Sequence, residues 1–169
     1  KVEIEAALKK AFHLQRVLWL HHGYLAGDDT DSHIDTLARF CDPRTIAYVR
    51  CEDTEDVHYE ALKKMEAELQ LFRTLEGALY RLIPLPMADE AVDEDGHRLP
   101  ATYANFLIIN GAVLLPFYGN SVKDDEALEA LKEAFPQHEI IGINCEPLIR
   151  QHGSLHCITM QYPEGAFDD

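Results

Sequence analysis

Residues 103–118 read YANFLIINGAVLLPFY, two apolar runs that meet at an Asn110-Gly111 pair. Asn-Gly between apolar runs is the strongest short-range signal for a β-hairpin, because both residues tolerate the backbone conformation that a tight turn requires. The next stretch has apolar residues three or four positions apart, which predicts a helix that ends at Pro136. A further apolar run at 139–144 predicts a third strand. The predicted order is therefore strand, strand, helix, strand.

The same order is expected once more, closer to the N-terminus. An earlier hairpin, the first along the chain, covers about 33–51 around an Asp-Pro-Arg turn. A helix-periodic stretch follows at 59–72 and an apolar run at 80–85. An amphipathic N-terminal helix and a strand-like run at 16–20 resemble the end of a further unit. Self-similarity of this kind indicates a repeat architecture. Related strings lie in the three helices, at 7–12 (ALKKAF), 61–65 (ALKKM) and 130–135 (ALKEAF).

These repeats predict the fold class. One strand-strand-helix-strand unit cannot bury both faces of its sheet, whereas several units around an axis can do so with their helices outside. We therefore expect an α/β (α+β) fold that forms a single domain over 1–169. Its units are a partial one at about 1–22, full ones at about 33–86 and 103–145, and a final partial one at 154–169.

The charge of the chain restricts its partners. With 169 residues, of which 47% are hydrophobic and 9% aromatic, it has the composition of a globular domain. Fifteen basic and thirty acidic residues give a net charge of −15, which disfavours nucleic acid and anionic membranes because few cations could replace their counterions. No apolar run approaches the roughly 20 residues of a membrane span. We expect no nucleic-acid or membrane partner, and the negative field suits a cationic ligand or serves solubility alone.

Four cysteines are scattered along the chain without a CxxC pair. Metal fingers and disulfide frameworks are therefore disfavoured, and a reducing cytosol is the expected compartment. The N-terminus is amphipathic and lacks the apolar core of a signal peptide, which also predicts a cytoplasmic location. Because the chain begins at Lys1 and not at methionine, we expect a piece of a longer protein.

The densest polar cluster, GDDTDSHID at 27–35, contains four carboxylates and an imidazole. Residues two apart on an extended chain face the same side, so His33 and Asp35 are expected to project together. The cluster fits a metal site, an acid/base pair with a cation-binding carboxylate, or an Asx-rich turn. A metal-dependent hydrolase of the first kind would use Asp29, Asp31, His33 and Asp35.

A second cluster, RQHGSLHC, ends at Cys157 and leads into a strand-like ITM. A single cysteine is more often a small buried hydrophobe than a nucleophile. Its position favours the second role, because Cys157 lies 14 residues after Ile143 in the last predicted strand. His33 lies 14 residues after Trp19 in the first one. In a repeat arrangement such equivalent positions converge near the axis, where Asn105 would join them.

Three ordered stretches resemble one known group of enzymes. They are GDDTDSHIDTLARF at 27–40, TYANFLIINGAVLLPFYG at 102–119 and RQHGSLHCITMQ at 150–161. Together they are similar to the C-terminal half of the agmatine deiminases, which belong with the bacterial peptidyl-arginine deiminases to the guanidine-modifying, or pentein, superfamily. The resemblance covers nearly the whole chain. It implies a β/α propeller, a fan of five strand-strand-helix-strand units, of which about half is present here.

The activity implied by the resemblance is hydrolysis of the guanidinium group of agmatine to N-carbamoylputrescine and ammonia, a step of putrescine and polyamine biosynthesis. By matching motif, Cys157 corresponds to the nucleophile and His33 to the general acid/base. Asp35 corresponds to a carboxylate that grips the guanidinium, and Asp29 is a candidate contact for the distal amine of the substrate. No metal or other cofactor is implied.

Two further matches, Asn105 and Gly153, are implied to support the site without reacting. A full member of this group is roughly twice as long, and its first half supplies another guanidinium-binding aspartate and an aromatic wall. The implied partners are therefore a small cationic guanidinium substrate and the missing N-terminal half of the same enzyme. Members are commonly homodimers. The chain alone is expected to be inactive, because half of the substrate clamp is absent.

Other functions remain open from the sequence. Arginine deiminase, peptidyl-arginine deiminase and dimethylarginine hydrolase belong to the same superfamily, and the first two would need a cation or an open cleft near the substrate carboxylate. Arg39 and Arg150 are candidates for that cation. From other classes, the alternatives are the metal-dependent hydrolase on the 29–35 cluster and a binding remnant that does not catalyse.

Overall fold

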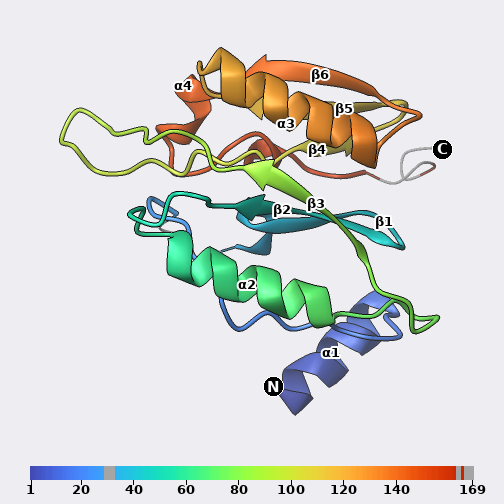
Figure 1. Cartoon of the computed structure of the whole chain (residues 1–169). Helices are drawn as coiled ribbons and strands as arrows, with labels where there is room; N and C mark the ends of the chain where they lie inside the picture. Colours follow the sequence, from blue (N-terminus) through green and yellow to red (C-terminus); the bar gives the residue numbers. More distant parts are fainter. Residues whose placement is uncertain (29–32, 163–164, 166–169) are drawn as a thin grey trace.

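Two β-β-α-β units follow each other along the chain, and each forms its own three-stranded sheet (Figure 1). The computed structural model describes residues 1–28, 33–162 and 165. The first unit is β1 (Ala38–Asp42), β2 (Thr45–Arg50), α2 (Tyr59–Leu71) and β3 (Arg81–Pro86), and the second is β4 (Leu107–Ile109), β5 (Ala112–Phe117), α3 (Ser121–Ala134) and β6 (Glu139–Asn144). Outside the units lie α1 (Val2–Phe12), α4 (Glu146–Ile149) and two 3-10 turns, Ile34–Thr36 and His156–Ile158.

Both sheets have the same topology. The first two strands pair antiparallel, with Ala38 opposite Tyr48 in one sheet and Leu107 opposite Leu114 in the other. The helix then carries the chain across, so that the third strand pairs parallel with the middle one. The middle strands β2 and β5 are the most buried, which explains their nearly continuous apolar sequence. The predicted hairpins and the α/β fold are confirmed.

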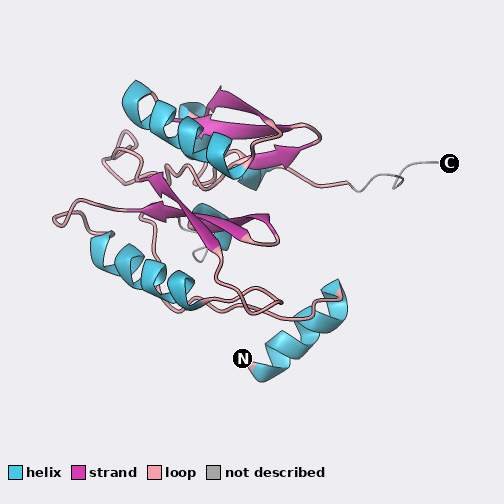
Figure 2. Ribbon diagram, turned by 45° about the vertical axis from the view of Figure 1, so that its right-hand side comes forward, coloured by secondary structure: helices cyan, strands magenta, loops and turns pink. Residues whose placement is uncertain are grey.

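The helices join the two units into one core. Helix α2 turns its apolar stripe, Leu62, Met65 and Leu69, towards β2, while α3 contacts β3 of the first unit as well as its own β6. In Figures 1 and 2 each sheet carries a helix, while α1 lies apart at one end. Because α3 bridges the units, a single hydrophobic cluster runs through both of them.

A buried carboxylate fastens the second hairpin to α3. Asp124 is buried in the first turns of that helix and accepts hydrogen bonds from the Tyr103 hydroxyl at 2.8 Å and the Tyr118 backbone N–H at 3.0 Å. Asn120 caps the same helix end, because its side-chain oxygen accepts from the N–H groups of Val122 and Lys123. These bonds fix the backbone at both ends of the hairpin that contains Asn105.

A buried histidine anchors the loop that precedes the first unit. His58 is fully buried, and its Nε2 accepts the Ala26 backbone N–H at 2.9 Å while its Nδ1 lies 2.5 Å from Asp56 Oδ1. The ring of Tyr24 stacks on it with 5.0 Å between centroids. The imidazole therefore holds 24–26 against the start of α2.

Four strand predictions were wrong: two strands begin later than predicted, and two do not form in the described residues. Residues 16–20 form no strand in the described part of the chain, since no neighbouring strand offers them a hydrogen-bonding partner. The strands predicted from about 33 and 103 begin only at Ala38 and Leu107, and the stretch after Cys157 leaves the 3-10 turn His156–Ile158 without forming a strand over 159–162. The physical reason is similar at 33–36 and 103–106, where side-chain hydrogen bonds bend the backbone away from an extended form.

Glycine is required at position 27 by a close approach of the backbone. Gly27 has φ +86°, and a Cβ atom there would lie 2.3 Å from the Arg98 carbonyl oxygen. Gly77 has nearly the same φ, +85°, with open space around it. We therefore expect Gly27→Ala to lower the unfolding free energy by about 2 kcal/mol more than Gly77→Ala, measured by urea denaturation. Equal losses would show that the close approach is not maintained in solution.

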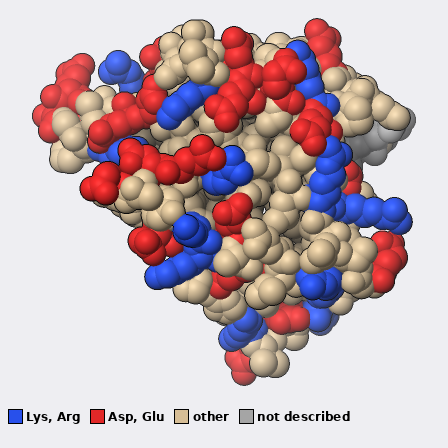
Figure 3. Space-filling view, viewed as in Figure 1, with Lys and Arg blue, Asp and Glu red and all other residues tan. Residues whose placement is uncertain are grey.

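Charged residues of both signs cover the face shown in Figure 3, with acidic ones in excess in the sequence. None of the helices in the described residues has the length and apolar character needed to cross a membrane.

Candidate functional site

Cys157 is the most exposed of the four cysteines. It lies in the 3-10 turn His156–Ile158 and is exposed, whereas Cys51 and Cys145 are buried and Cys41 is partly buried. Burial raises the pKa of Cys41 to about 12 and that of Cys145 to about 11. Because the thiolate is the reactive form of cysteine, these two thiols are unreactive near neutral pH. Cys157 is therefore the candidate nucleophile on structural grounds as well.

Asn105 holds the turn that carries Cys157. It is fully buried at the start of the second hairpin, and its Oδ1 accepts the backbone N–H of His156 at 2.8 Å and that of Cys157 at 3.3 Å. The Cys157 thiol also lies 3.5 Å from the same oxygen. The amide group of Asn105 donates on its other side to Asp35, at 3.0 Å to Oδ2. One side chain thus joins the two predicted clusters, which are more than 100 residues apart in the sequence.

Asp35 faces the thiol. Its Oδ2 lies 3.8 Å from Cys157 Sγ and 2.7 Å from His156 Nδ1. Burial acts to raise the pKa of Asp35, but the hydrogen bond and charge of His156, the charge of Arg39 and the hydrogen bond of Asn105 outweigh it, so the pKa is lower than usual. The carboxylate is accordingly charged at neutral pH, as binding of a cationic group requires.

His156 was not predicted as a site residue, although it precedes Cys157 in the second cluster. Its imidazole is partly buried and makes the shortest contact with Asp35. A signal was present in the sequence, because the histidine belongs to the same polar motif as the cysteine. No role for it follows from the sequence, because a strand-like stretch is expected only after Cys157 and nothing fixes the direction of the His156 side chain. The observed 3-10 turn instead directs both side chains towards Asp35.

His33 is not brought into this network in the described part of the chain. Its side chain is exposed and makes no hydrogen bond there, while its backbone N–H donates to Asp28 Oδ2 at 3.2 Å. The expectation that His33 and Asp35 share one face of an extended strand was wrong, because the chain enters the 3-10 turn Ile34–Thr36 directly after His33. Asp29 and Asp31 lie outside the described residues.

Gly153 lies behind the thiol. A Cβ atom there would be 3.1 Å from Cys157 Cβ and 3.7 Å from its Sγ, so glycine lets the two segments approach. The next residue, Ser154, is buried, and its hydroxyl lies 2.7 Å from that of Tyr118. Tyr118 also donates to the Thr102 carbonyl at 3.0 Å. The segment before Cys157 is thereby tied to the second hairpin.

The two arginines considered for a substrate carboxylate differ in position. Arg39 on β1 is half-buried, donates to the Phe106 carbonyl at 2.8 Å and lies 5.0 Å from the centroid of the Phe106 ring. Burial lowers the pKa of Arg39, although the negative charge of Asp35 acts to raise it. Arg150 is exposed at the end of α4.

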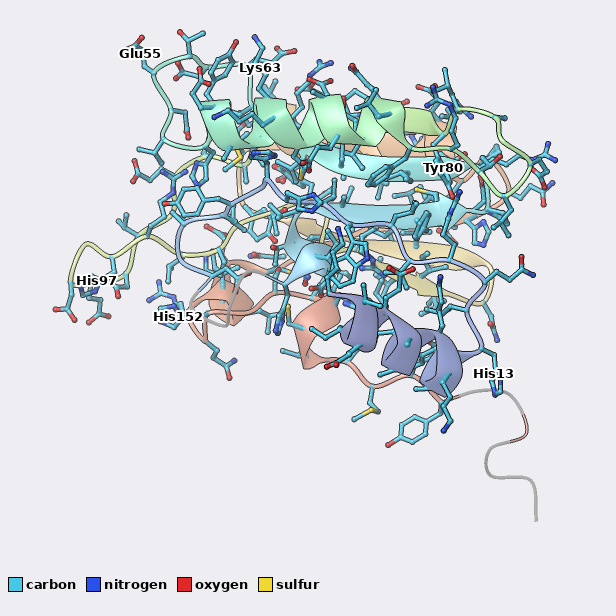
Figure 4. The ribbon with its side chains drawn as sticks, turned by 90° about the horizontal axis from the view of Figure 1, so that it is seen from below. His13, Glu55, Lys63, Tyr80, His97 and His152 are labelled. Atoms are coloured by element: carbon cyan, nitrogen blue, oxygen red, sulfur yellow. The ribbon has the colours of Figure 1, made fainter. Side chains whose placement is uncertain are left out.

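One group of possible metal ligands occurs among the described residues, and it is remote from Cys157. Asp93, Asp95 and His97 lie on the exposed loop between β3 and β4, with ligand atoms within 4.8 Å of one another. Figure 4 shows His97 at the far end of that loop. Asp93 Oδ1 accepts the backbone N–H groups of Asp95 and His97 at 2.9 and 2.8 Å, which is the geometry of an ordinary Asx turn.

The lowered pKa of Asp35 predicts how the stability of the fold depends on pH. Because its folded-state pKa lies below the ordinary value of 3.8, the charged form stabilises the fold. That contribution is complete above the ordinary pKa and is lost as the pH falls through the folded-state value. We expect wild type to be more stable than Asp35→Asn at about pH 6 and the difference to shrink towards about pH 3, measured by urea denaturation. A difference that is independent of pH would contradict the assignment.

An accessible thiol beside a charged carboxylate and an imidazole is the arrangement found in enzymes that act through a cysteine nucleophile. The β-β-α-β units that carry it narrow this class further. The sequence profile of the Porphyromonas-type peptidyl-arginine deiminase family matches residues 1–163, and the chain belongs to that family.

Relatives with solved structures share the fold. A Porphyromonas gingivalis structure, provisionally described as an arginine deiminase, is 60% identical with a TM-score of 0.91 and covers 95% of this chain but 47% of its own. An agmatine deiminase from C. jejuni, solved as a cysteine-to-serine variant with substrate bound, is 46% identical with a TM-score of 0.84, over 92% of this chain and 44% of its own. These similarities confirm the predicted family.

Curated relatives give the same picture of length. The agmatine deiminase of Medicago truncatula is 32% identical over 96% of this chain, which corresponds to 48% of the relative. The chain thus spans about half the length of the curated relatives it matches.

Proposed function

We propose that this chain is the C-terminal half of an agmatine deiminase, which hydrolyses a guanidinium group through a covalent cysteine intermediate. The observation that carries the proposal is the 3.8 Å approach of the exposed Cys157 thiol to Asp35, whose carboxylate is charged at neutral pH. A carboxylate at this distance can hold a guanidinium nitrogen while the sulfur faces the guanidinium carbon. The net charge of −15 agrees with a cationic substrate.

The proposed reaction has two balanced halves. The Cys157 thiol gives its proton to the general acid/base, for which His33 is proposed, and the sulfur adds to the guanidinium carbon. The C–N bond then breaks and ammonia leaves with that proton. Water then adds to the same carbon after giving a proton to that base. The C–S bond breaks, which releases N-carbamoylputrescine and restores the thiol. Asp35 binds the cationic group throughout, and Asp29 is proposed to bind the distal amine.

The remaining units are proposed to come from the other half of the enzyme. Five units arranged as a fan around an axis would cover the inner edges of both sheets, where the exposed apolar residues include Phe40 on β1 and Ile109 on β4. That half would supply the second guanidinium-binding aspartate and an aromatic wall. The isolated chain is therefore proposed to be inactive, and the complete enzyme is proposed to form a homodimer.

The test is an ammonia-release assay on the 169-residue chain, alone and mixed with the N-terminal half of the Porphyromonas gingivalis relative. Agmatine, free arginine and a peptidyl-arginine are the three substrates. If the mixture hydrolysed agmatine and the isolated chain did not, the result would support the proposal in full. A preference for peptidyl-arginine would move the function to the activity after which the family is named. If a chelator abolished the activity and a thiol-alkylating reagent left it unchanged, the metal-dependent alternative would be favoured.

A further inference from the structure

We infer that His156 is a positioning residue that holds one oxygen of Asp35, so that the other oxygen is presented to the substrate and the carboxylate opposes ionisation of Cys157 less strongly. The inference rests on the proposed function for the identity of the substrate. Its test reads the Cys157 thiol directly and needs no turnover.

The two oxygens of Asp35 have different surroundings. Oδ2 accepts from His156 Nδ1 at 2.7 Å and from Asn105 Nδ2 at 3.0 Å, and it lies 3.8 Å from Cys157 Sγ. Among residues 1–28 and 33–162, no hydrogen bond reaches Oδ1. Within the described residues, one oxygen is therefore engaged twice, while its neighbour is open to a guanidinium N–H.

The imidazole of His156 is held in place from its backbone. Its N–H donates to Asn105 at both the side-chain oxygen, 2.8 Å, and the carbonyl oxygen, 3.2 Å. A charged carboxylate can only accept, so Nδ1 carries the proton of this contact. The side chain of His156 is 35% exposed and that of Asp35 is 17% exposed, so solvent screens the pair only in part.

The effect on Cys157 follows from charge. A carboxylate 3.8 Å from sulfur disfavours the thiolate, and a donor on that carboxylate oxygen reduces the effect. Other titratable or charged groups face the thiol from two strands, Arg39 on β1 and Tyr118 just after β5. Neither is altered when His156 is replaced, so their influence cancels in a comparison of variants.

Three substitutions of His156 separate the effect of its hydrogen bond to Asp35 from the effect of its side-chain size. In His156→Asn the side-chain N–H occupies the place of Nδ1, whereas in His156→Gln it reaches towards the place of Nε2, and His156→Ala has no donor. The measurement is the rate of Cys157 alkylation by iodoacetamide as a function of pH, with the modified peptide identified by mass spectrometry. His97→Ala, on the remote exposed loop, is the control.

We expect His156→Ala and His156→Gln to move the midpoint of alkylation upward by about one pH unit, which is a tenfold lower rate below the midpoint. His156→Asn should stay close to wild type. In an Asp35→Asn background the three substitutions should have no further effect. Equal midpoints in all variants, or an equal shift in Asn and Gln, would overturn the inference.

The comparison of His156→Asn with His156→Gln keeps the test decisive if His156→Ala does not fold. Folding of each variant is checked by circular dichroism. A mixture of this chain with the N-terminal half that releases no ammonia from any of the three substrates would contradict the proposed function and leave this result unaffected, because alkylation requires only the thiol and its neighbours.

Discussion

Cys157→Ala abolishes ammonia release by the mixture of this chain with the N-terminal half of a relative, with an expected loss of about ten-thousand-fold or more. The reason is that the proposed covalent bond to the guanidinium carbon is formed by the Cys157 sulfur, 3.8 Å from Asp35. The paired halves should still associate, since the exposed Cys157 side chain contributes little to the core. Steady-state ammonia release from agmatine, with binding of the substrate measured separately, tests both statements.

The matched control is Cys41→Ala on β1. This cysteine is partly buried, and its raised pKa of about 12 keeps it protonated, so its removal should leave turnover within a few-fold of wild type. An active Cys157→Ala enzyme would exclude the covalent mechanism and direct attention to the carboxylates of the 27–35 cluster. Loss of turnover together with loss of substrate binding would mean that the thiol supports the site without attacking.

Asn105→Ala is expected to cost about 2–4 kcal/mol of folding free energy. It is also expected to remove the preference of iodoacetamide for Cys157 over the other cysteines. The side chain is fully buried and links Asp35 to the backbone of His156 and Cys157. Removing it leaves buried hydrogen-bonding groups without partners, which is more costly than the bonds themselves. Urea denaturation measures the first effect, and iodoacetamide labelling followed by peptide mapping measures the second.

Two comparisons make that result specific. Asn120→Ala removes a side chain that caps α3 and should cost only about 1 kcal/mol. Asn105→Asp keeps the size and the acceptor oxygen but sets a second carboxylate against Asp35, so it should be about as harmful as alanine. An Asn105→Asp variant as stable as wild type would show that the amide does not donate to Asp35 in solution.

Local sequence patterns predicted most of the elements because they depend on near neighbours. The Asn110-Gly111 turn has φ +78° at Gly111, as a tight hairpin requires, and apolar spacing identified α2 and α3. The errors occurred where long-range bonds compete with local preference. Residues 16–20 have the composition of a strand but no partner strand in the described part of the chain, and 103–106 bend to bring Asn105 inward.

The candidate site was predicted only in part for the same reason. Motif resemblance identified Cys157, Asp35 and Asn105, and the tertiary contacts bring these three together. The roles of all these residues, and those of His33, Asp29 and Gly153, stay predictions. His156 belongs to the same polar motif as Cys157, but its contact with Asp35 depends on a 3-10 turn that local sequence did not predict.

Residue order alone thus establishes the family and the β-β-α-β units and identifies the candidate nucleophile, since each is encoded in short stretches of chain. Three-dimensional packing establishes which oxygen of Asp35 is engaged, which histidine engages it, and how the buried amide of Asn105 joins segments that lie about 50 and 70 residues away along the chain. Hydrogen bonds between distant segments depend on the packing of both units around α3, so no local pattern of residues can specify them.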